Sequence, residues 1–129
     1  MIPIVSPAEM ALIDATAPES EVELIGRAGA AVARVAVAHM GGTYGRHVVV
    51  VAGKGNNGND GREAARRLVR RGVRLTVIDA LAAPACLPAC DLVIDAAYGT
   101  GFRGRYRAPE PPPGVPVLAV DIPLSLIHI

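Results

Sequence analysis

The chain contains 129 residues with a mass of 13.3 kDa, which fits one domain because chains usually divide only beyond roughly 250 residues. Its 13 basic and 12 acidic residues give a net charge of +1, which is too balanced for a protein that binds phosphate backbones. With 3% aromatic residues and no Trp, it also lacks the stacking surface of single-strand binders. No apolar run approaches the roughly 18 residues of a membrane helix. We therefore expect no nucleic-acid partner and no membrane partner.

The chain has only two cysteines, Cys86 and Cys90. Neither a second cysteine pair nor a histidine stands at zinc-finger spacing from them. Unpaired cysteines of this kind fit a reducing compartment, so we predict a cytoplasmic protein.

Two helices are predicted before the first strand. Residues 6–9 (SPAE) form a capping box with proline at the first helical position, which predicts a short helix over 6–15. Ser20 and Glu23 repeat the box, and apolar residues then follow at helical spacing. This second helix is predicted to end near Gly41.

The remainder alternates between strands and helix. Residues 47–52 (HVVVVA) contain the continuous valine run of a strand buried on both faces of a parallel sheet. A helix over 60–71 and strands over 73–79, 91–95 and 115–121 are predicted to follow, which indicates a doubly wound α/β fold. If the chain returns past the strand over 47–52 after forming the second one, the order of the strands across the sheet is 73–79, 47–52, 91–95, 115–121. A ligand crevice then opens between the first and third strands.

Three polar segments each follow a predicted strand at its carboxyl end, so we expect them to meet at one edge of the sheet. They are residues 53–61 (GKGNNGNDG), 95–101 (DAAYGTG) and 121–123 (DIP). Glycines let a backbone approach a ligand closely and adopt positive φ, and the helix predicted to begin near Asp60 offers free N–H groups to a phosphate. The pattern predicts a phosphorylated ligand.

The spacing of the first segment leaves a second interpretation open. Residues 53–58 match the G-x-G-x-x-G pattern of dinucleotide binding, and Asp79 ends the next strand, where an acidic residue that binds the ribose belongs. An NAD-dependent dehydrogenase is therefore an alternative, as is a glycine-rich turn without a ligand. Pyrophosphate binding does not explain four residues between the glycines whose oxygens suit a cation or a hydroxylated ligand, namely Asn56, Asn57, Asn59 and Asp60.

These segments resemble the NAD(P)H-hydrate epimerase family, also called the YjeF N-terminal domain. That family has a G-N-N-G-G-D-G loop after a strand, a later D-A-x-x-G-T-G loop and a strand ending V-D-I-P-S-G. This chain has residues 55–61 (GNNGNDG), 95–101 (DAAYGTG) and 120–123 (VDIP) in the same order, and residues 26–33 are similar to the family's E-x-A-G-x-A-V helix. The resemblance covers nearly the whole of residues 1–129, as one domain.

The resemblance implies a Rossmann-like three-layer α/β sandwich with a mainly parallel sheet and N-terminal helices. The implied activity is interconversion of the R and S forms of hydrated NADH or NADPH at C6 of the nicotinamide ring, a metabolite repair reaction. It also implies a homodimer, and in some chains a fused ADP/ATP-dependent dehydratase domain. A dehydrogenase that leaves NAD intact and a non-catalytic dinucleotide-binding module are the alternatives.

The resemblance also implies the roles of individual residues. Asn57 and Asp95 would bind a potassium ion, and Asp121 would be the catalytic residue. Epimerisation requires the hydroxyl at C6 to leave and water to return, so a carboxyl can act as acid and base in turn. The implied substrate-binding residues are Asn56, Asn57, Gly58, Asn59, Asp60, Gly99, Thr100, Gly101, Phe102, Arg103, Gly104, Arg105 and Asp121.

Some positions depart from the family pattern. Asn59 replaces a glycine, a change we attribute to the ease with which Asn adopts the left-handed region. Gly26 stands where the family has Glu or Asn. After Pro123, residues 124–129 (LSLIHI) replace the Ser-Gly whose serine completes the potassium site. This ending resembles translated adapter sequence, so we expect a domain that is incomplete at its C-terminus, after about the fourth strand.

Two further interpretations concern the predicted helix over 60–71. An arginine recurs at every fourth residue, which is more typical of a solvated face than of the alternative, a phosphate-binding stripe; the four are Arg62, Arg66, Arg70 and Arg74. Asp60, at the predicted start of the helix, is expected to be its N-cap as well as a ligand-binding residue.

Overall fold

The computed structural model describes residues 2–3, 21–97 and 108–120. The short helix predicted over 6–15 lies outside these residues. The described elements, in chain order, are β1 (Ile2–Pro3), α2 (Glu21–Met40), β2 (His47–Ala52), α3 (Asn56–Arg70), β3 (Arg74–Asp79), the 3-10 helix η1 (Ala80–Ala82), β4 (Leu92–Ala96) and β5 (Val117–Ala119).

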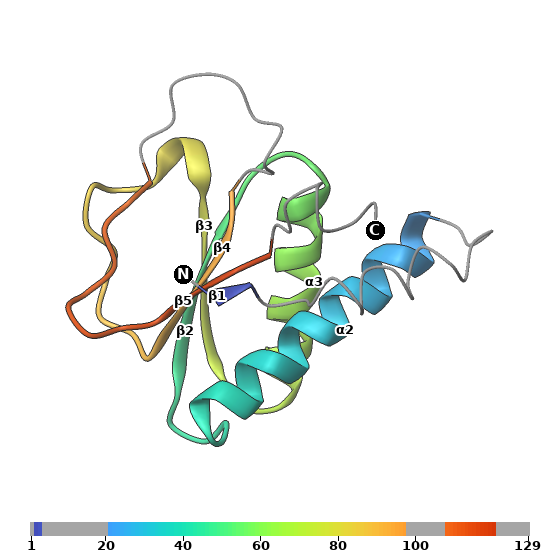
Figure 1. Cartoon of the computed structure of the whole chain (residues 1–129), viewed down its shortest axis with the longest axis horizontal. Coiled ribbons are helices and arrows are strands. Elements are labelled where there is room, and N and C mark those ends of the chain that lie inside the picture. The colour runs from blue at the N-terminus through green and yellow to red at the C-terminus, as the bar shows by residue number, and fades with distance from the viewer. Residues whose placement is uncertain (1, 4–20, 98–107, 121–129) are drawn as a thin grey trace.

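One parallel sheet forms the centre of the molecule (Figure 1). Its strand order is β1-β5-β4-β2-β3, and every described pair of neighbouring strands is parallel. The order predicted for the four strands β2, β3, β4 and β5 is therefore confirmed, as is the α/β class. Sequence reasoning missed β1, which pairs with β5 at the edge.

The last described strand is shorter than predicted. Strand β5 begins at Val117 rather than at 115. Pro116 lacks a backbone N–H, and the N–H of Val115 donates to the carbonyl of Pro112 at 3.2 Å and closes a turn. Val120 follows the strand and donates to the carbonyl of Asp95 at 3.0 Å. Pairing with β4 is thereby extended toward the carboxyl end of the sheet.

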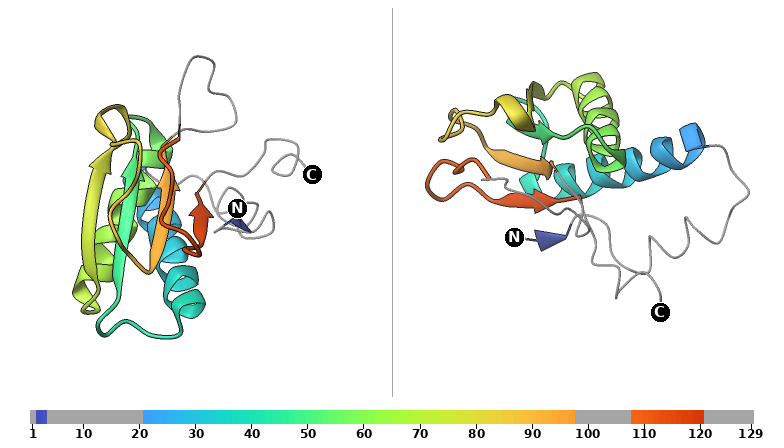
Figure 2. Two further views of the ribbon diagram at one scale, coloured as in Figure 1. Left: turned by 90° about the vertical axis from the view of Figure 1, so that its left-hand side faces the viewer. Right: turned by 90° about the horizontal axis from the view of Figure 1, so that it is seen from above.

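Helices α2 and α3 both cover the same face of the sheet (Figures 1 and 2). Their side chains form one core with alternate residues of the strands, including the fully buried Val32, Val50, Leu68 and Ile94. The helices approach closely at Gly29, where a Cβ atom would overlap the side chain of Glu63. The predicted apolar face of the second helix is confirmed by the burial of Ala28 and Val32.

The opposite face of the sheet has a thinner covering. There a smaller cluster joins Val49, Val51 and Val93 to Ala80 of η1 and to Leu87. The covering segments are the connections over 80–91 and 108–116, drawn in yellow to light orange and in red-orange in Figure 1. They are tied together by the N–H of Leu87, which donates to the carbonyl of Glu110 at 2.9 Å. The third layer of the described fold is thus made of short irregular segments.

Candidate ligand-binding edge of the sheet

The ends of β2 and β4 are joined at the carboxyl edge of the sheet. Gly53, which directly follows β2, donates its N–H to the carbonyl of Ala96 at 2.9 Å. A Cβ atom at Gly53 would overlap the carbonyl oxygen of Ala97, so a larger residue would push the two segments apart. The glycine-rich segment and the segment that begins at Asp95 therefore meet, as their positions after neighbouring strands predicted.

Helix α3 begins at Asn56, four residues before the predicted start near Asp60. Gly55 is the N-cap in an extended conformation, and the N–H of Asn59 already donates to the carbonyl of Gly55 at 3.1 Å. The early start is possible because Gly58 lets the first turn rest on Gly53, whose carbonyl oxygen a Cβ atom at Gly58 would overlap. The expectation that Asp60 is the N-cap is therefore wrong.

The glycines of this segment act through close packing. The positive φ expected of them is not found at Gly53, Gly55, Gly58 or Gly61, and the left-handed conformation invoked for Asn59 is not found either. Instead, a Cβ atom at Gly61 would meet the Cβ of Ala96 at 2.5 Å. These glycines bring the start of α3 down onto the ends of β2 and β4.

Arg62 reinforces this junction, a role that the sequence analysis missed. Its Nη1 atom donates to the carbonyl oxygen of Gly53 at 2.9 Å. Arg62 lies one turn after Gly58, so both face the same backbone carbonyl. The four-residue spacing from Gly58 is the sequence signal for this contact, and it is the same spacing that predicts a solvated face for Arg62.

The five predicted ligand-binding residues 56–60 all lie in the first turns of α3. The side chain of Asn56 is exposed, and those of Asn57, Asn59 and Asp60 are half-buried. Burial raises the pKa of Asp60 from 3.8 to about 7. A carboxyl group that titrates near neutral pH is unusual, and such groups concentrate at functional sites.

Asp95 lies on β4 beside the joined strand ends. Its Oδ1 atom accepts a hydrogen bond from the N–H of Ala97 at 3.1 Å. The side chain lies on the thinly covered face and lines a small cavity of about 130 Å³ together with Val51, Val93, Val117 and Pro109. Asp95 and the start of α3 therefore flank the same junction, whereas the predicted ligand-binding residues 99–105 and Asp121 lie outside the described residues.

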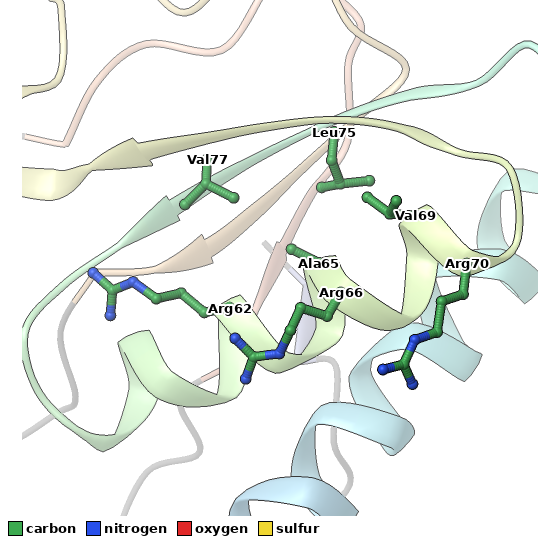
Figure 3. Close-up of a pocket in the computed structure, with 7 residues that line it drawn as sticks. All are labelled: Arg62, Ala65, Arg66, Val69, Arg70, Leu75 and Val77. Carbon is green, nitrogen blue, oxygen red and sulfur yellow. The ribbon is translucent and has the colours of Figure 1, made fainter.

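A larger hollow of about 580 Å³ lies elsewhere, between α3 and the edge strand β3 (Figure 3). Leu75 and Val77 of β3 line it opposite Ala65 and Val69 of α3. Arg62, Arg66 and Arg70 extend along its helical side, so three of the four arginines expected on a solvated face line this hollow. Arg66 also pairs with Glu63, at 2.9 Å from Nε to the carboxylate.

The described residues form neither a metal cluster, nor a disulfide, nor a membrane-spanning helix. Residues 2–3, 21–97 and 108–120 contain no group of three His, Cys, Asp or Glu side chains placed to hold a metal ion. Both cysteines are free; Cys86 is exposed and Cys90 is half-buried. Within the same ranges, neither helix has the length and apolar character needed to cross a membrane.

Together, the parallel sheet and the glycine-packed strand ends define a Rossmann-like α/β domain with a candidate ligand site at the carboxyl edge. The family described as YjeF-related protein N-terminus matches residues 21–87, just over half of the sequence. This chain belongs to that family.

Individual relatives agree with this assignment. An NAD(P)H-hydrate epimerase of Ajellomyces capsulatus is 37% identical, over 63% of this chain and 47% of the relative. A bifunctional NAD(P)H-hydrate repair enzyme of Thermofilum pendens is 32% identical, over 93% of this chain and 30% of the relative. The crystal structure of the yeast protein ynu0 shares the fold, with a TM-score of 0.52 at 22% identity, and the match covers 95% of this chain and 71% of the yeast chain. The chain spans about half the length of the epimerases that it matches.

Proposed function

We propose that this chain is an NAD(P)H-hydrate epimerase, an isomerase that interconverts the R and S forms of hydrated NADH or NADPH. The observation that carries the proposal is the junction of Gly53 with Ala96, which joins the segment that leads into α3 to the end of β4, the strand that carries Asp95. Family membership and the names of the relatives support it. The substrate would lie across the carboxyl edge, held by residues 56–60 and by the segment 99–105.

Asp121 is the proposed acid and base. Its carboxyl group would donate a proton to the C6 hydroxyl, which leaves as water while the ring nitrogen stabilises the resulting cation. Water then adds to C6 from the opposite face, and the carboxylate of Asp121 accepts the proton that this water loses. The proton returns to its starting place, so the reaction needs no other reagent.

A potassium ion is proposed to organise the site. Asn57 offers an amide oxygen at the start of α3, and Asp95 offers a carboxylate of which Oδ1 accepts one hydrogen bond from Ala97. Oxygen donors of this type suit a hard cation, so the residues present fit such an ion. Potassium would hold the two segments together and bind substrate oxygens, because its charge density is too low for strong Lewis acidity.

The test of the epimerase is Asp121→Asn in the full chain, with isomer-resolved chromatography of hydrated NADH before and after incubation. We expect epimerisation to fall by roughly 100-fold or more, while dinucleotide binding is retained. Asp91→Asn is the matched control, because Asp91 precedes β4 at the opposite edge of the sheet.

The outcomes separate the alternatives. Activity of Asp121→Asn within a few-fold of the parent would show that Asp121 is neither acid nor base. Hydride transfer by the unmodified chain would identify a dehydrogenase, and binding without conversion would identify a non-catalytic module.

The potassium site has its own test. Potassium should raise the melting temperature more than lithium at equal ionic strength, and Asp95→Ala should abolish the difference. Equal effects of the two ions, unchanged by Asp95→Ala, would contradict a specific site.

The wider assignment follows from the same family. We place the reaction in the cytoplasm, which suits the free thiols of Cys86 and Cys90. We also propose a homodimer. The proposed second repair activity is an ADP/ATP-dependent dehydratase, fused or separate, and the bifunctional relatives support it.

A further inference from the structure

Strand β3 is the outermost of the described strands on one side of the sheet, whose order is β1-β5-β4-β2-β3. In a parallel ladder, the backbone N–H and C=O groups of successive residues point alternately to the two sides of a strand. Arg74 faces β2, because its N–H donates to the carbonyl of Arg46 at 2.9 Å. The N–H and C=O groups of Leu75 and Val77 therefore point away from β2, where an added strand would pair with them.

The side chains of the same two residues form an apolar wall beside this edge. Leu75 and Val77 line the hollow of about 580 Å³ opposite Ala65 and Val69 of α3 (Figure 3). Val77 is 48% exposed and Val69 is 55% exposed, so both sides of the hollow present apolar surface. Apolar surface next to the open edge of a sheet is typical of a place where another chain docks.

The charged residues that line the hollow are all arginines, namely Arg62, Arg66 and Arg70. Arg62 donates to a backbone carbonyl, which leaves its positive charge in place. Arg66 shares the carboxylate of Glu63 with Arg67. The side chain of Arg70 is exposed and takes part in none of the ion pairs between described residues. The lining is therefore positively charged, and charge complementarity favours an acidic occupant.

The spacing of the arginines fits an extended occupant. Figure 3 shows them in a row along the hollow, with Arg62 toward the end that holds Val77 and Arg70 toward the end that holds Val69. Residues four apart in a helix are separated by about 6 Å along its axis. Every second side chain of a strand lies on the same face, at steps of about 6.7 Å. Acidic side chains at alternate positions of a strand beside β3 would therefore each meet one arginine.

We propose that β3 and the arginine-lined hollow form a docking site for an extended acidic segment of another protein. The segment adds to the sheet as a strand beside β3, and its acidic side chains face Arg62, Arg66 and Arg70. Backbone pairing with β3 provides affinity, and the arginines provide the preference for acidic residues. The site goes beyond the proposed epimerase activity, because none of its lining residues is among those assigned to the substrate or to potassium.

The test uses the full chain and the synthetic peptide acetyl-EVETEV-amide, which has glutamate at alternate positions. Calorimetry measures binding, and hydrogen exchange followed by NMR reports on the backbone of β3. We expect the peptide to bind and to slow exchange of the N–H groups of Leu75 and Val77. The same peptide with N-methylated backbone amides cannot donate hydrogen bonds to β3 and should bind at least about tenfold more weakly. Acetyl-KVKTKV-amide should not bind.

Two charge-reversal variants test the arginines. Arg70→Glu places a negative charge in the lining and should weaken binding of the acidic peptide at least about tenfold. Arg71→Glu is the matched control, because Arg71 is equally an exposed residue at the end of α3 but does not line the hollow. This variant should bind the peptide within about threefold of the parent. Melting temperatures of both variants show that they are folded.

Several outcomes would overturn the proposal. Failure of the acidic peptide to bind would mean that the arginines only keep the edge of the sheet in water. Equal binding of the methylated and unmethylated peptides would show attraction between charges without strand pairing. A change in oligomeric state of Arg70→Glu without peptide, measured by sedimentation, would identify the occupant as a second copy of this chain. Each of these results leaves the epimerase proposal standing, because isomer-resolved chromatography tests that activity separately.

Discussion

Helices α2 and α3 cover one face of the sheet with a continuous apolar core, whereas η1 and two irregular segments cover the other. The helical face includes fully buried side chains from both helices and three strands, such as Val32, Leu68 and Leu118. The other face holds a smaller cluster and includes Asp95 beside a cavity. The comparison indicates that the helical face provides most of the stability, while the thinly covered face leaves a polar side chain accessible to a ligand.

The largest expected effect tests this difference in stability directly. Leu68→Ala removes a fully buried side chain from the helical face, and we expect a loss of about 3 kcal/mol in the free energy of unfolding. Leu87→Ala on the other face should cost about half as much, because the irregular segments around it can collapse into the space. Urea denaturation of both variants gives the comparison. Equal losses would show that the two faces contribute alike.

A second prediction concerns how α3 is held against the strand ends. Gly58→Ala places a methyl group against the carbonyl oxygen of Gly53, so the start of the helix must shift. We expect a loss of about 2 kcal/mol, although alanine is favoured over glycine inside a helix by about 1 kcal/mol. Thermal and urea unfolding measure the change.

Gly55→Ala is the matched control for this prediction. No atom lies within 4 Å of a Cβ at Gly55, and its φ of −87° suits alanine. This variant should change stability by less than about 1 kcal/mol. Equal losses at the two glycines would mean that helix capping, rather than the contact with Gly53, determines stability here.

These glycines also mark the limit of what the sequence could predict. The valine run of β2 and the strand ending at Asp79 have strong local patterns, so both strands could be predicted, and the strand order was predicted on the condition that the chain returns past β2. The start of α3 could not be predicted in this way, because Asn56, Asn57 and Gly58 are typical of a loop. Their place in the helix goes with the tertiary contact between Gly58 and Gly53, which local sequence patterns do not predict. The tie from Arg62 to Gly53 depends on the same contact.

The smallest expected effect concerns Asp60, in the part of α3 that joins the core to the ligand edge. Burial raises the pKa of Asp60 from 3.8 to about 7, so the folded protein holds this proton more tightly than the unfolded chain does. The stability that protonated Asp60 contributes is therefore fully present below about pH 4 and is lost as the pH rises through about 7. Because Asp60 is only half-buried and solvent screens its charge, we expect a change of about 1 kcal/mol between pH 5 and pH 8.

Asp60→Asn distinguishes this contribution from those of other groups. Asparagine does not ionise, so the variant should lose the part of the pH dependence that Asp60 causes and should exceed the parent in stability at pH 8. Glu110→Gln, which removes an exposed carboxylate on the other side of the sheet, should follow the parent curve. Urea denaturation at several pH values measures all three proteins. Parallel curves for the parent and Asp60→Asn would mean that Asp60 is already ionised at pH 5. In that case the start of α3 is as well hydrated as an ordinary helix end. The close packing of Gly58 on Gly53 then does not raise the pKa of the Asp60 carboxyl group.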